Sequence, residues 1–179
     1  MRADLFWSID ASSLGVVAAA GHAPVPPALR GSLKPGFQYT NWVPVSGRIR
    51  TVPYNPKAVA AADLPDDVMR FPEVDLKFGW APAYGAFQSF VTAMRLLEGE
   101  DATGAWLEAM AGKCTEYAGE LGVVMGVSRR EVDLGFANHY YTLRLKQGKP
   151  DADVELAFTR DDAGCLVNAS GVVLLRESE

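Results

Sequence analysis

The stretch from His139 to Arg160 constrains the fold most, because two alternating segments flank a run of turn-forming residues. Apolar residues occupy every second position over 138–146 and again over 153–160. This two-residue period is typical of strands with one covered face. The segment 147–152 between them contains Gly, Pro and Asp, which favour a loop. We therefore expect an antiparallel hairpin.

One register satisfies both faces of this hairpin. Pairing Leu143 with Leu156 places Lys146 opposite Asp153 and His139 opposite Arg160. Opposite charges then face each other on the outer side, whereas a slip of one residue would set apolar side chains against charged ones.

The chain after the hairpin predicts two more strands. Residues 161–164 and 168–171 carry the Asp, Asn and Gly that are typical of turns, and short apolar segments follow them at 165–167 and 172–176. The C-terminal region is thus expected to form an antiparallel meander of about four strands.

Proline dominates the N-terminal third. Ten of the eleven prolines lie between Pro24 and Pro82, so loops and short edge strands are expected there rather than long helices. Residues 37–43 and 48–52 have strand character, with 44–47 as a hairpin connection between them.

Three helices can be placed around this region. Asp10 is positioned to cap a helix over 11–20, which follows an apolar strand over 4–9. A stripe at spacings of three and four predicts a second helix over 83–97. A third helix over 101–121 contains interior glycines and is expected to break near Gly112.

Together these elements predict an α+β fold. A C-terminal antiparallel sheet is packed by the two central helices, and the proline-rich third supplies loops and edge strands. The chain of 179 residues is expected to form a single domain over 1–179.

Composition narrows the class of protein. With 49% hydrophobic residues and a net charge of −5, the chain fits a soluble globule and has no basic nucleic-acid footprint. No run of 18 apolar residues predicts a membrane span. Asp4 and Asp10 lie where an export signal carries positive charge, and the apolar run after them is short, so a cytoplasmic location is expected.

No metal or cofactor is expected from the sequence motifs. The only histidines and cysteines are His22, Cys114, His139 and Cys165, and they do not show ligand spacing. The two cysteines are interpreted as reduced core residues. Phosphate-binding glycine loops are also missing from the sequence.

The segment Asn138-His139-Tyr140-Tyr141 is the densest group of potentially chemical side chains. The hairpin register brings His139, Tyr141 and Arg160 to one end of the sheet, where they form a candidate acid–base site. The simpler interpretation is that His139 bonds a backbone carbonyl and Arg160 pairs with a turn aspartate.

Two groups of residues are candidates for a partner-binding surface. Trp42, Arg48, Arg50 and Trp80 are of the types that anchor protein interfaces. The acidic segment 98–120, which includes Glu108 and Glu116, carries a net charge of −5 and could face a basic partner. Both groups also fit a structural role, as core aromatics and as a solvated helix face.

These observations favour a small protein-binding or inhibitor module that occupies the surface of another protein. A non-enzymatic role is favoured because catalytic signatures are missing. The alternative is a small α+β enzyme or ligand-binding domain with a pocket near His139 and Arg160. The sequence does not determine the oligomeric state.

Overall fold

The structure is a computed structural model that describes residues 3–176, and it divides into two compact units. The first unit contains the chain up to Gly47 and from Asn168 onward, and the second contains residues Arg48–Val167. Strand β2 (Val43–Tyr54) begins in the first unit and ends in the second. The expectation of a single domain over 1–179 stays a prediction.

In the first unit, β1 (Leu5–Ser8) pairs antiparallel with β8 (Val167–Leu174), which lies between β1 and β2 in the strand order. Two helices accompany these strands, α1 (Ala11–Ala20) and α2 (Pro27–Ser32). The core consists of Leu14, Ala18, Trp42, Ala169 and Val173.

The second unit has a mixed sheet. Strand β2 pairs antiparallel with β5 (Leu134–Gly135), β6 (Ala137–Asn138) and β7 (Glu155–Ala157). Strand β3 (Phe78–Trp80) pairs parallel with β4 (Cys114–Glu116) and with β5. The predicted α+β fold with an antiparallel meander is therefore wrong, since helices alternate with strands that pair in parallel.

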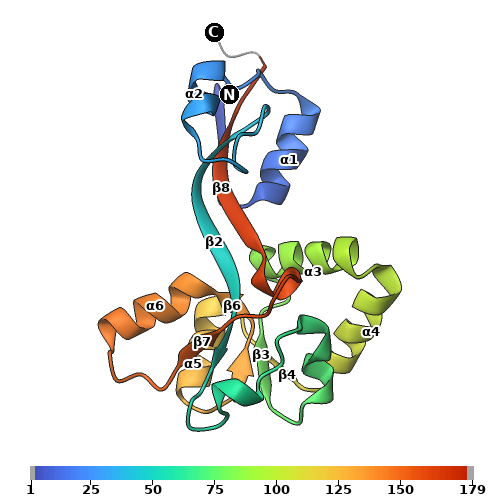
Figure 1. The fold of residues 1–179 in the computed structure, drawn as a ribbon, viewed down its shortest axis with the longest axis vertical. Coiled ribbons are helices and arrows are strands. Elements are labelled where there is room, and N and C mark those ends of the chain that lie inside the picture. Colours follow the sequence, from blue (N-terminus) through green and yellow to red (C-terminus); the bar gives the residue numbers. More distant parts are fainter. Residues whose placement is uncertain (1–2, 177–179) are drawn as a thin grey trace. The chain divides into compact units, whose positions relative to one another are not determined.

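Helices cover both sides of this sheet. In Figure 1, α3 (Gly85–Leu97) and α4 (Glu100–Ala111) lie on one side of β3, and α5 (Glu120–Ser128) and α6 (His139–Gly148) lie on the other. Three short 3₁₀ segments complete the unit, η1 (Ala61–Asp63), η2 (Val68–Glu73) and η3 (Ala163–Cys165).

Each side of the sheet has its own apolar core. On the α3 and α4 side, the ring of Phe136 contacts four other aromatic rings, those of Phe71, Phe78, Phe90 and Trp106. On the α5 and α6 side, Val124 and Val127 pack with Val132 and Val154. A sheet that is covered on both faces explains why strands such as β3 are apolar throughout.

The predicted hairpin over 138–160 does not form, because its first strand is helix α6. Tyr141 and Leu145, which alternate as in a strand, are also four residues apart and pack together on the core. Leu143, expected in the core, is 53% exposed. Alternation over so few residues fits a helix as well as a strand.

Two further turns expected from glycine are continuous strand. Residues 168–171 lie within β8, and residues 44–47 lie within β2. At Gly171 the reason is a close contact, since a Cβ there would lie 2.5 Å from Cε3 of Trp42. This glycine therefore marks a tight approach of a side chain instead of a change in chain direction.

Other expectations are confirmed. Strand β1 and helix α1 lie where predicted, and the Asp10 carboxylate caps α1 by accepting from the Ser12 amide at 2.8 Å. Helix α3 buries Phe87, Phe90 and Met94. The third predicted helix breaks at Gly112 as expected, but β4 and α5 follow in place of its second half.

Within residues 3–176, the structure contains no helix with the length and apolarity that a bilayer crossing requires.

The contact at Gly171 predicts a stability effect. Gly171→Ala should destabilise the first unit by about 1–3 kcal/mol, because the added Cβ meets the Trp42 ring and the Val43 carbonyl oxygen. Gly31→Ala is the control, since a Cβ there meets no described atom within 4 Å. Denaturant unfolding of both variants tests this, and equal stability for the two would contradict it.

Candidate functional site

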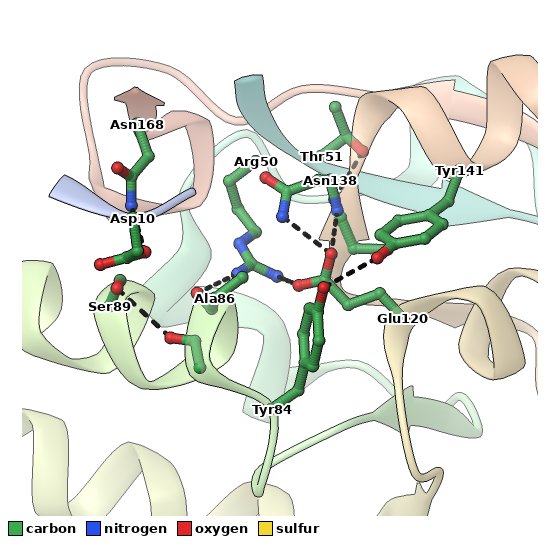
Figure 2. A network of polar contacts seen from close by, with 12 residues as sticks. Asp10, Arg50, Thr51, Tyr84, Ala86, Ser89, Glu120, Asn138, Tyr141 and Asn168 are labelled. Carbon is green, nitrogen blue, oxygen red and sulfur yellow. Dashed lines mark hydrogen bonds and ion pairs between the residues drawn. The ribbon is translucent and has the colours of Figure 1, made fainter. Parts of the chain in front are cut away.

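Three tyrosines of the second unit form the candidate site. The hydroxyl groups of Tyr84 and Tyr141 are 2.9 Å apart, and Figure 2 shows them pointing at each other. The rings of Tyr140 and Tyr141 have centroids 4.3 Å apart. All three side chains are partly exposed, so a ligand can reach them.

Local structure explains this grouping. Tyr84 is the residue immediately before α3 and has an extended backbone, while Tyr140 and Tyr141 lie in the first turn of α6. Adjacent residues on a helix point about 100° apart, so the hydroxyl groups of Tyr140 and Tyr141 leave the helix in different directions. The hydroxyl group of Tyr84, which comes from another segment, contacts that of Tyr141.

A buried ion pair lies beside the tyrosines. Nη1 of Arg50 donates to Oε1 of Glu120 at 2.7 Å, and both side chains are almost fully buried. Oε2 of Glu120 accepts from the backbone amide and from the side-chain amide of Asn138, each at 2.8 Å. The carboxylate is thus satisfied on both oxygens.

Arg50 is held from a further side as well. Its Nη2 donates to the carbonyl oxygen of Ala86 at 2.5 Å, so the guanidinium lies between α3 and Glu120 (Figure 2). The guanidinium carbon also lies 5.1 Å from the ring centroid of Phe90, a cation–π contact. Burial lowers the pKa of Arg50, and the nearby Glu120 carboxylate opposes this shift.

The environment keeps the phenols protonated in the absence of a cation. The hydrogen bond to Tyr141, followed by burial, raises the pKa of Tyr84 to about 12. Burial is the main cause that raises the pKa of Tyr140 and of Tyr141. The negative charge of Glu120 raises the pKa of all three.

Such a cluster suits a hard, highly charged cation. Phenolate oxygens are hard anionic donors, and a bound cation reverses the local preference for the protonated form. In the part of the chain that the structure describes, no three His, Cys, Asp or Glu side chains gather as a metal site. The tyrosine oxygens of the second unit are donors of the hard type.

The predicted acid–base residues are only partly brought together. His139 lies at the start of α6, next to the tyrosine pair, and its Nδ1 accepts from the Ile49 amide at 3.2 Å. Arg160 instead lines a pocket of about 520 Å³ formed by residues 61–74 and 157–160. Tyr141 is the one of the three that lies in the cluster.

Half of the six predicted partner-binding residues are inside the protein. Trp42, Arg50 and Trp80 are at most 8% exposed. Arg48 is half-buried, and only Glu108 and Glu116 lie on the surface. Glu120, counted above as part of an acidic surface, is buried in the ion pair.

Sequence reasoning missed Tyr84 and Glu120, and it gave no site role to Asn138 and Tyr140 although both lie in the segment that it singled out. The adjacent tyrosines were the available signal, because two neighbouring phenols in a segment rich in chemical side chains are visible in the sequence. Glu120 gave no signal, since its partner Arg50 is 70 positions away.

The sequence comparisons point to iron-binding proteins. No family model matches this chain. The Fe(3+)-binding periplasmic protein of Serratia marcescens is 31% identical over 185 residues, which cover 99% of this chain and 55% of that protein. The major ferric iron-binding protein of Neisseria meningitidis serogroup B is 31% identical over 187 residues, with 99% and 56% covered.

A solved structure shows the same fold. The crystal structure of iron-bound HitA from Pseudomonas aeruginosa matches with a TM-score of 0.88 and 28% identity, covering 100% of this chain and 60% of that one. The chain therefore has the fold of an α/β periplasmic-binding-protein lobe. It spans between half and two thirds of the length of these proteins.

These similarities overturn several expectations. An inhibitor or protein-binding module is wrong, because the relatives' names specify ferric iron as the ligand and no protein partner. The ligand-binding alternative is better supported. The cytoplasmic location is also wrong, since the Serratia relative is named as a periplasmic protein. The names describe binding proteins and not enzymes, in line with the favoured non-enzymatic role.

Over nearly its whole length, this chain is thus similar to about half of a ferric iron-binding protein, and it presents three clustered tyrosines.

Proposed function

We propose that this chain binds ferric iron as cargo, through the tyrosines at the start of α6 and before α3, and that it acts in the periplasm without catalysis. The observation that carries the proposal is the gathering of three phenol oxygens on two segments of one unit. The relatives named for ferric iron support the choice of metal.

The chemistry of the cluster favours a trivalent ion. Each phenol that coordinates iron loses one proton and becomes a phenolate, so three phenolates would balance the charge of one Fe³⁺. Divalent ions of similar size repay this proton loss less well, because their attraction to each oxygen is weaker. The raised pKa values of the tyrosines therefore select for a strongly charged cation.

The relatives are longer than this chain, so their iron ligands can include groups that this chain does not contain. This chain spans 55% of the Serratia protein, and the positions on iron that three tyrosines leave open are filled in our proposal by solvent anions or by groups outside the chain. In this proposal iron is a transported ligand and not a resident cofactor. The expectation that the chain needs no cofactor therefore stays a prediction.

Tyrosine substitution tests the proposed site. Titration of the chain with ferric citrate should give a visible phenolate-to-iron charge-transfer band that saturates at one iron per chain. Tyr141→Phe and Tyr140→Phe each remove an oxygen that would coordinate iron. Loss of a residue that only supports a metal ligand typically weakens binding by roughly 10–100-fold, and we expect each of these variants to weaken iron binding by more than that. Absorbance titration with citrate as competitor measures the affinity.

Tyr117→Phe is the matched control for these variants. Its hydroxyl donates to the exposed Glu131 carboxylate at 3.2 Å, outside the cluster. This variant should keep the band and the affinity. A band of full intensity in the Tyr140→Phe, Tyr141→Phe double variant would contradict the proposed site.

Iron affinity should also depend on pH. A tyrosine with its ordinary pKa of about 10 is already protonated at neutral pH, and the site raises the pKa further, so iron must displace protons in order to bind. Affinity should therefore fall as pH falls, by about tenfold per pH unit for each proton released. Competition with a chelator from pH 8 to pH 6 tests this, after correction for the protonation of the chelator itself. An affinity that does not change over this range would contradict it.

A further inference from the structure

The buried Arg50–Glu120 pair has contacts that reach both segments of the tyrosine cluster. We propose that Glu120 is the positioning residue of this cluster, because its carboxylate connects the start of α6 with the first turn of α3. The proposal rests on the iron site proposed above.

Glu120 fixes the start of α6 directly. Its Oε2 accepts two hydrogen bonds from Asn138, the residue immediately before the helix, and both are 2.8 Å long. Tyr140 and Tyr141 follow within the first turn of this helix. A shift of Asn138 would therefore carry both phenols with it.

Glu120 fixes the start of α3 through Arg50. Oε1 accepts from Arg50, and the other terminal nitrogen of Arg50 donates to the carbonyl oxygen of Ala86, two residues after Tyr84. The Phe90 ring, one turn further along α3, lies against the guanidinium. Figure 2 shows this connection running from Asn138 through Glu120 and Arg50 to Ala86.

Stability alone does not account for this arrangement. A buried ion pair is expensive to desolvate, and apolar residues of similar volume often serve a core equally well. Here every hydrogen bond described for the two charged side chains leads to the partner, to Asn138 or to Ala86. The carboxylate is thus placed where it can hold the two tyrosine-bearing segments at a fixed spacing.

Glu120→Gln tests the positioning role. Glutamine keeps the shape of the side chain, but its amide nitrogen is a donor and must face either Arg50 or Asn138, which are donors too. We expect iron affinity to fall by about 10–100-fold and the phenolate-to-iron band to move in wavelength. The band shift reports changed phenolate geometry, which a loss of stability alone would not produce. Melting curves of the iron-free chain check that the variant folds.

The matched control is Asp153→Asn, the same exchange of carboxylate for amide at an ion pair of the same unit. Asp153 pairs with Lys57 at 2.7 Å, and both side chains are solvent-exposed. This variant should bind iron with the band and the affinity of the unmodified chain.

Arg50→Lys carries the test if Glu120→Gln does not fold. A lysine keeps the positive charge beside Glu120, but its single ammonium group cannot repeat the two-pronged reach to Glu120 and Ala86. It should also weaken iron binding and move the band. If either folded variant binds iron with unchanged affinity and an unchanged band, the positioning role is overturned and the iron site stands. If the unmodified chain binds no iron, the proposed function itself fails.

Discussion

The buried ion pair between Arg50 and Glu120 is the interaction on which the functional part of this chain depends. Charges are rarely buried without full compensation, and here both oxygens of the carboxylate and two nitrogens of the guanidinium have partners. The pair reaches from strand β2 to helices α3, α5 and α6. The hydrogen bonds of this ion pair thus link the two segments of the second unit that carry the three tyrosines.

The tyrosine cluster and the fold support the same function by independent routes. The fold is that of a periplasmic-binding-protein lobe, which by itself does not determine the ligand. In our proposal the cluster supplies the donors for a hard cation, because a phenol that loses its proton on binding becomes a hard anionic phenolate. The relatives are named for ferric iron, and our proposal therefore takes this ion as the cargo.

Part of this fold could be predicted from the sequence where local chemistry decides the structure. The Asp10 cap, the apolar stripe of α3 and the break at Gly112 all depend on neighbouring residues, and all three are confirmed. Helix α6 was missed because Tyr141 and Leu145 satisfy a strand period and a helix period alike. The parallel pairing of β3 with β4 and β5 could not be predicted, since these strands are only two or three residues long.

In the site, Tyr141 was a candidate, whereas Glu120 looked like a surface acid because nothing near it in sequence shows its partner Arg50.

The most direct test of the central claim is a crystal structure of the chain soaked with ferric citrate, with anomalous diffraction measured at the iron edge. The account predicts one strong anomalous peak within bonding distance of the hydroxyl oxygens of Tyr84, Tyr140 and Tyr141. A peak at another place, such as the pocket that Arg70 and Arg160 line, would contradict the account, as would a saturating soak that leaves the tyrosines without iron.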